Sequence, residues 1–141
     1  MTSNSSSLKQ SVQSVLAPIA DDLKAVNEIL EREFAHSQSP TITEIGSYIT
    51  QAGGKRMRPA LLMLMAKALG YDGTAHRELG ATIEMLHTAT LMHDDVVDEG
   101  MMRRGRPTAN ARWGNSVAVL VGDFMYTLSL IHISEPTRLA L

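Results

Sequence analysis

The stretch LMHDDVVDEG, residues 91–100, places five ionisable side chains within seven positions at the end of an apolar segment. On an α-helix each residue turns by about 100°, so Asp94 and Asp98 lie roughly 40° apart on one face, with Asp95 close by. Like charges one turn apart repel, and carboxylates at a carboxyl-terminal helix end face the unfavourable pole of the helix dipole. A hard cation such as Mg²⁺ offsets that cost, because it takes carboxylate oxygens while it binds substrate phosphates. Taken alone, the stretch is equally typical of a solvated acidic helix end.

Two basic clusters favour the metal interpretation. GGKRMRP, residues 53–59, sets three cations on a turn after two glycines and before a helix, where backbone N–H groups and side chains can share an anion. MRRGRPT, residues 102–108, brings three arginines soon after Asp98. His87 falls within about 20° of the face that carries Asp94, where it could meet the same anion. Either basic cluster alone is typical of a solvated turn, but together with the aspartates they predict a diphosphate site.

Composition sets limits on the kind of protein. The 141 residues, 44% hydrophobic and 20% charged, are typical of one globular domain. The net charge of −2 predicts no nucleic-acid partner, and the lack of cysteine excludes disulfides, thiolate metal sites and a cysteine nucleophile. The polar start, and the lack of an apolar run near the roughly 20 residues of a membrane span, predict a soluble, cytoplasmic protein with no transmembrane segment.

The elements that must position these residues are all helical by periodicity, so the predicted fold class is all-α. Residues 8–35 form two helical pieces divided near Pro18, followed by a loop over residues 36–40. Thr41 and Glu44 have the pattern of a capping box at the start of a short helix that stops at Gly53. Further along are a helix from Pro59 to Gly70, a helix from about Thr74 to Glu99, a basic turn over residues 101–108 and an apolar segment from Asn115.

The last residues do not resemble the rest. LSLIHISEPTR, from Leu128, resembles the translated sequence of a common transposase-type sequencing adapter. We therefore expect residues 1–127 to be the native portion and residues 128–141 to be a non-native tail. The alternative is an ordinary apolar helix that ends in a Ser-Glu-Pro turn.

Three segments, GGKRMRP, IEMLHTATLMHDDVVDEGMMRRGRPTANARWGN and VLVGDFMY, together resemble trans-type polyprenyl diphosphate synthases, most closely the octaprenyl and solanesyl synthases of bacteria. The resemblance covers about residues 15–127. It implies the amino-terminal part of the isoprenoid-synthase helical bundle, usually a homodimer. It also implies a Mg²⁺-dependent prenyltransferase that condenses isopentenyl diphosphate with an allylic diphosphate into a long-chain product.

The resemblance also implies roles for single residues. Asp94, Asp95 and Asp98 would form the catalytic aspartate motif that holds Mg²⁺, and Arg103 would contact the allylic diphosphate. The diphosphate of isopentenyl diphosphate would be bound by Lys55, Arg58, His87 and Arg104. The growing chain would pass residues before Asp94 on the same helix, so the expected channel residues are Ala89, Thr90, Leu86 and Ile83. Ala89 and Thr90 are small, which predicts a long product.

Members of the family carry a second aspartate-rich motif on a later helix. The acidic residues after Asp98 are Glu99, Asp123 and Glu135, which make no such motif. We therefore expect this 141-residue chain to be an inactive amino-terminal fragment that exposes apolar helix faces.

Other classes of protein fit these residues less well. A terpene cyclase would leave GGKRMRP without a role. A metal-dependent phosphohydrolase using His87, His93 and Asp94 as metal ligands would leave the basic motif MRRGRPT without a role. A non-catalytic subunit of a heteromeric prenyl synthase remains open, although such subunits usually have degraded aspartate motifs and the motif here is intact.

Overall fold

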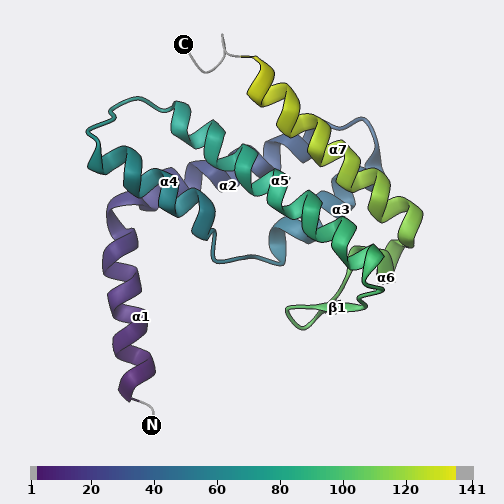
Figure 1. Cartoon of the computed structure of the whole chain (residues 1–141), viewed down its shortest axis with the longest axis horizontal. Helices are drawn as coiled ribbons and strands as arrows, with labels where there is room; N and C mark the ends of the chain where they lie inside the picture. The colour runs from purple at the N-terminus through teal and green to yellow at the C-terminus, as the bar shows by residue number, and fades with distance from the viewer. Residues whose placement is uncertain (1–2, 136–141) are drawn as a thin grey trace.

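The computed structural model describes residues 3–135, and these residues are almost entirely helical (Figure 1). The elements in chain order are α1 (Ser3–Leu16), the 3₁₀ turn η1 (Ala17–Ile19), α2 (Ala20–Ala35), α3 (Pro40–Gln51), α4 (Met57–Ala68), α5 (Ala75–Val97), β1 (Met102–Arg103), β2 (Arg106–Pro107), α6 (Ala109–Trp113) and α7 (Asn115–Ser134). The predicted all-α class is confirmed, and so is the division of the first helical region near Pro18, which lies in η1.

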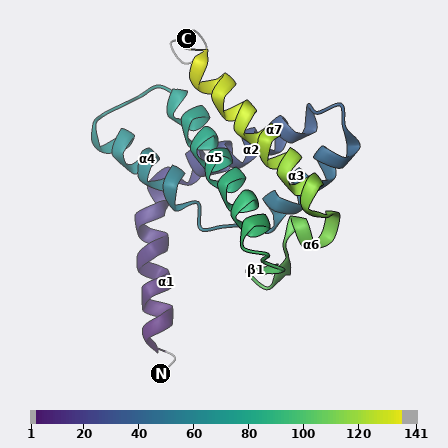
Figure 2. The ribbon, with the colours of Figure 1, turned by 45° about the vertical axis from the view of Figure 1, so that its right-hand side comes forward.

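The long helix α5 lies at the centre and packs against α7, α4 and α2, while α1 extends away from the other helices (Figures 1 and 2). The core is built from small and flexible apolar side chains of α5 and α7 against larger ones of α2. Its fully buried members include Val26, Ile45, Met63, Ala81, Met85, Val121 and Met125. Because α5 is held on several sides, residues along it keep fixed positions relative to the loops at its ends.

The start of α3 differs from the predicted capping box. Its N-cap is Ser39, whose Oγ accepts a hydrogen bond from the Ile42 N–H at 3.5 Å, and not Thr41. Pro40 explains the difference, because proline suits the first helical position and keeps the preceding residue extended, as an N-cap must be. Thr41 is therefore already inside the helix.

The basic segment over residues 101–108 is a β-hairpin, where we expected only a turn. Arg103 pairs with Arg106, and Met102 with Pro107, in an antiparallel register. Arg104 and Gly105 have φ of 52° and 75°, the left-handed conformations that a tight two-residue hairpin turn requires. Strands of two residues are too short to show alternating faces in a sequence, so periodicity missed them. The short helix α6 was missed for the same reason.

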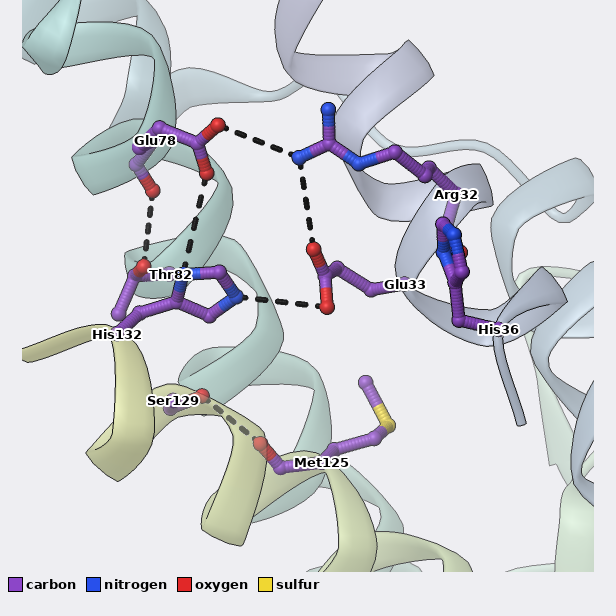
Figure 3. Close-up of polar contacts among 8 residues, drawn as sticks. All are labelled: Arg32, Glu33, His36, Glu78, Thr82, Met125, Ser129 and His132. Carbon is purple, nitrogen blue, oxygen red and sulfur yellow. Dashed lines mark hydrogen bonds and ion pairs between the residues drawn. The ribbon is translucent and has the colours of Figure 1, made fainter. Parts of the chain in front are cut away.

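A partly buried polar group links three helices (Figure 3). The imidazole of His132 on α7 lies between two carboxylates, with Nε2 3.5 Å from Glu33 Oε2 on α2 and Nδ1 3.9 Å from Glu78 Oε2 on α5. Arg32 completes the group, because its Nη2 donates to Glu78 Oε1 at 3.2 Å. These contacts tie α2 and α7 to the amino-terminal part of α5.

Helix α7 continues past Thr127 to Ser134, and residues 136–141 lie outside the described residues. Among residues 3–135 it is the one helix long and apolar enough to cross a membrane, by length and composition alone, although we expected no such segment. A third (33%) of its 18-residue apolar stretch is buried inside the protein. Core helices of soluble proteins can be equally long and apolar. The proposed boundary at Thr127 stays a prediction.

Apolar side chains also remain exposed along α5 and α7, as we expected. They include Ile83, Leu86, Val97, Leu120, Leu130 and Ile131.

Candidate functional site

Four side chains from three separate segments line one open cavity of about 500 Å³. Lys55 and Arg58 come from the α3–α4 connection and the first turn of α4, His87 comes from α5, and Arg104 comes from the tip of the hairpin. These are the four residues that we expected to bind one diphosphate. The tertiary structure therefore brings the two basic clusters of the sequence to one place, which we call the anion cavity.

The backbone of the α3–α4 connection allows this convergence. Gly53 has φ of 69°, and Gly54 lies so close to the hairpin that a Cβ there would be 2.8 Å from Arg104 Nη1. Arg104 Nη1 in turn donates a hydrogen bond to the Gly53 carbonyl at 2.5 Å. The two glycines thus give the loop its turn and leave room for an arginine from another segment.

Three cations of the anion cavity, Lys55, Arg58 and Arg104, have no carboxylate partner within residues 3–135. Lys55 and Arg58 are exposed and make no hydrogen bond or ion pair with residues 3–135, and Arg104 is bonded to a backbone carbonyl. Their positive charge is therefore available to an anion, and it attracts one more strongly than cations already paired with carboxylates would.

The electrostatics of His87 follow from this surplus of positive charge. Burial lowers the pKa of the His87 imidazole below its ordinary value, Arg58 adds to that effect, Glu84 opposes it, and Arg104 and Arg103 lower it again. The imidazole is therefore neutral at pH 7. It can donate one N–H to an anion, and it can take up a proton when an anion offsets the nearby cations.

A second, smaller cavity of about 100 Å³ adjoins the first and shares four lining residues with it, Arg56, Glu84, His87 and Arg104. It is lined at its far side by Asp95 and Arg103, and elsewhere mainly by apolar side chains such as Leu91. The anion cavity and the aspartate motif are therefore neighbours in space, joined along one side of α5.

Asp95 is engaged within the protein. Its Oδ1 accepts from Arg103 Nη2 at 2.8 Å and its Oδ2 accepts from Arg103 Nε at 2.9 Å, a two-point ion pair. The hydrogen bond to Asp95 raises the pKa of Arg103, although burial opposes it. The other three N–H groups of Arg103 have no hydrogen-bond partner within residues 3–135, so the guanidinium keeps donors for an anion.

Asp94 and Asp98 are exposed, and their side-chain oxygens have no partner within the described chain. The structure does not gather the three aspartates into one group, and no set of three His, Cys, Asp or Glu side chains in residues 3–135 lies close enough to hold a metal. The reason is that Asp95 turns to Arg103. The two free carboxylates still suit Mg²⁺, which is commonly held by one or two carboxylates together with substrate phosphates.

His93 lies apart from these residues. Its Nε2 is 3.1 Å from the Val119 carbonyl and 3.4 Å from Asp123 Oδ1 on α7, and its ring fits against Gly122, where a Cβ would lie 2.4 Å from Nε2. His87 and His93 therefore face different elements. The phosphohydrolase interpretation, which needs both as ligands of one metal, has no support in this geometry.

The expected channel residues divide into two sets. Ile83, Leu86 and Thr90 are exposed along one face of α5, which also carries Asp94. Ala89 is 2% exposed and lies in the core, because it is about 140° around the helix from Asp94. The structure therefore does not bring Ala89 to the face that carries the other three, and its role stays a prediction.

Sequence reasoning missed one residue of the cavity and misjudged two arginines. Glu84, which lines the anion cavity, was missed, although a glutamate one turn before His87 on an apolar helix was an available signal. Arg56, one of the three cations of GGKRMRP that could share an anion, is paired there with Glu84. Arg106, counted among the basic cluster, lies instead with its guanidinium carbon 4.2 Å from the centre of the Tyr48 ring.

Comparison with known proteins gives a consistent result. The polyprenyl synthetase family matches residues 39–140. An octaprenyl diphosphate synthase of Escherichia coli (strain K12) is 52% identical over 108 residues, which cover 77% of this chain and 33% of that protein. The chain thus spans about a third of the length of this curated relative.

Solved structures agree with the sequence comparison. A decaprenyl diphosphate synthase from Rhodobacter capsulatus superposes with a TM-score of 0.82 at 43% identity, covering 87% of this chain and 38% of that one. A polyprenyl synthase from Caulobacter crescentus CB15, complexed with calcium and isoprenyl diphosphate, superposes with a TM-score of 0.83 at 35% identity. The match covers 88% of this chain and 38% of that one.

Proposed function

The chain belongs to the polyprenyl synthetase family, and on that premise we propose that it forms the first part of a prenyltransferase that condenses isopentenyl diphosphate with an allylic diphosphate. The observation that carries the proposal is the anion cavity, in which Lys55, Arg58, His87 and Arg104 converge beside the aspartate motif. The product is a long-chain polyprenyl diphosphate. The activity belongs to a polypeptide of the relatives' full length.

Lys55, Arg58 and Arg104 hold the diphosphate of isopentenyl diphosphate by charge-assisted hydrogen bonds, which are the strongest kind available for such a group. His87 adds an N–H donor on the α5 side. Three directions of approach, from the α4 loop, from α5 and from the hairpin, fix the orientation of the diphosphate. The attached double bond is thereby held in one position relative to the second substrate.

The allylic diphosphate binds at the carboxyl end of α5. Arg103 offers it the N–H donors that Asp95 leaves free, and Asp94 and Asp98 are the residues that would hold Mg²⁺. The bound metal would supply charge neutralisation for the diphosphate of this substrate. The relative from Caulobacter crescentus, which is complexed with calcium and isoprenyl diphosphate, supports a divalent cation and a diphosphate ligand for this site.

The chemistry needs no protein nucleophile. The C1–O bond of the allylic substrate breaks, Arg103 stabilises the charge that develops on the departing diphosphate, and an allylic cation forms. The double bond of isopentenyl diphosphate attacks C1 of that cation, and loss of a proton restores a double bond. The apolar walls beside α5 exclude water, which would otherwise capture the cation.

The growing chain runs along the α5 face formed by Ile83, Leu86 and Thr90, away from Asp94. The protein is cytoplasmic and homodimeric at full length, as in the family that it resembles. The 141-residue chain alone transfers no prenyl group, because it supplies one aspartate motif and no second one.

Calorimetric titration of the chain with isopentenyl diphosphate tests the first half of this proposal. Replacing Lys55 or Arg58 by Gln should weaken binding about tenfold or more, because each substitution removes a charge-assisted hydrogen bond. Lys24→Gln is the matched control, since Lys24 is exposed on α2 and has no partner within the described residues. Equal affinities for all four chains would refute the assignment of the cavity.

A second experiment tests the expected inactivity. The chain is incubated with Mg²⁺, isopentenyl diphosphate and an allylic diphosphate, and the products are separated by chromatography. Any elongated product would overturn the statement that this chain alone is inactive.

A further inference from the structure

We propose that Arg56, although it stands within the basic motif, is a positioning residue whose charge neutralises the buried Glu84 and so keeps the anion cavity open to a diphosphate. The inference rests on the proposed function, because it concerns how the same cavity is made ready for its ligand. It separates the cations of GGKRMRP into two that are free for an anion and one that is not.

The guanidinium of Arg56 is bonded to two other helices. Its Nε donates to Asn27 Oδ1 on α2 at 2.9 Å, and its Nη1 donates to Glu84 Oε1 on α5 at 3.1 Å. The side chains of Arg56 and Glu84 are 14% and 9% exposed, so the pair is largely withdrawn from water. Lys55 and Arg58, the other two cations of the motif, are exposed and unpaired within residues 3–135.

The backbone of Arg56 gives an independent sign that these contacts matter. Its φ of 48° is in the left-handed region, which an arginine adopts at some cost in free energy. Arg56 is also the N-cap of α4, and its carbonyl accepts the Ala60 N–H at 2.9 Å in the first turn. Side-chain bonds to two other helices offset this strain and fix the direction in which the loop enters α4. Arg58 lies in the first turn of α4, so its position follows from that direction.

Glu84 explains why a positive charge is needed at this place. It is a buried carboxylate that lines the same cavity as Lys55, Arg58 and His87. Without a partner its charge would repel a diphosphate and oppose the attraction of the cations. Paired with Arg56, it contributes a fixed anchor, and its charge is offset in part while it still opposes the lowering of the His87 pKa.

The alternative is that Arg56 itself binds the diphosphate. The guanidinium keeps three N–H groups that its existing contacts do not use, but its charge is already offset by the Glu84 carboxylate, so a diphosphate gains less from Arg56 than from Lys55 or Arg58. Drawing Arg56 away would leave Glu84 buried and unpaired, which is strongly unfavourable. Lys55 and Arg58 carry no such penalty.

A double-substitution cycle separates the two roles. The variants Arg56→Gln, Glu84→Gln and Arg56→Gln/Glu84→Gln are titrated with inorganic pyrophosphate in the calorimeter, and circular dichroism confirms that each is folded. Arg32→Gln is the matched control, because Arg32 pairs with Glu78 at the surface, outside the cavity. The positioning role predicts binding about tenfold weaker for Arg56→Gln, and restored to within about threefold in the double variant, whose two amides can still hydrogen bond.

The protonation of His87, followed by NMR, gives a second measurement that a packing role would not change. The charged groups that face this imidazole are Arg58, Glu84, Arg104 and Arg103. Leaving Glu84 unopposed in Arg56→Gln should raise the pKa of His87, and Glu84→Gln should lower it. Equal values in all the folded variants would overturn the proposal.

The remaining outcomes are also decisive. A double variant that binds as weakly as Arg56→Gln would make Arg56 a ligand and overturn the inference. If Arg56→Gln alone unfolds, the double variant is compared with the unsubstituted chain: binding within about threefold supports the inference, and binding about tenfold weaker overturns it. If the unsubstituted chain fails to bind pyrophosphate, the proposed function fails, whereas the two opposite shifts of the His87 pKa still test the neutralising role.

Discussion

Binding of a diphosphate to the anion cavity should be coupled to protonation of His87. In the free chain, burial, then Arg58, and then Arg104 and Arg103 lower the pKa of this imidazole, and Glu84 alone opposes them. A bound diphosphate reverses the sign of the local field, so the pKa of His87 is higher in the complex than in the free protein. Protonated His87 then binds the anion as a charged donor.

The sign and the size of the effect follow from linkage. The pKa of His87 in the free chain lies below the ordinary imidazole value of about 6.5, so its neutral form predominates at pH 7. As the pH falls between the pKa of the complex and that of the free chain, binding takes up one proton. The affinity can therefore increase by at most about tenfold per pH unit, and only within that window. Above the window, the affinity gains nothing from protonation.

The assay is calorimetric titration with pyrophosphate from about pH 7.5 down to about pH 5.5, a range in which carboxylates of ordinary pKa stay ionised. Pyrophosphate itself titrates in this range, so His87→Gln is the reference chain and the quantity of interest is the ratio of the two affinities. The ratio should favour the unsubstituted chain more strongly as the pH falls. A ratio independent of pH, or one that grows as the pH rises, would refute the reasoning.

Three further predictions follow from the helices. In a full-length synthase, Thr90→Phe should shorten the product as judged by chromatography, because Thr90 is exposed on the face of Asp94. Ala89→Phe should instead lower the free energy of unfolding by roughly 1–3 kcal/mol, since a ring would overpack the core. A shorter product from Ala89→Phe and an unchanged one from Thr90→Phe would place the channel on the face of α5 that carries Ala89. Ser39→Ala should lower the free energy of unfolding in urea by about 1 kcal/mol, and Thr41→Ala should lower it much less. Equal losses for the two variants would contradict the assignment of Ser39 as the N-cap. Gly46→Ala should destabilise the packing of α3 on α2, because its Cβ would lie 2.2 Å from Phe34 Cγ, and an unchanged unfolding midpoint would contradict that contact.

Local sequence was sufficient for most of the helical framework. Pro18, Gly53 and Gly70 mark helix ends through backbone geometry that a single residue imposes, so those boundaries could be read directly. The cap at Ser39 was missed because Ser39 and Thr41 both suit an N-cap, and Pro40 between them decides in favour of Ser39. The hairpin was missed because its strands are shorter than the period that reveals a strand.

The sequence by itself determined the chemical types of the site, since DDxxD and the two basic motifs are local patterns of charge. It could not determine which charges are free. Arg56, Arg103 and Arg106 look alike in the sequence, yet Glu84, Asp95 and the Tyr48 ring engage them in the folded chain, and Lys55, Arg58 and Arg104 keep their charge for an anion. Pairing depends on distances between segments far apart in the sequence, and only tertiary packing sets those distances.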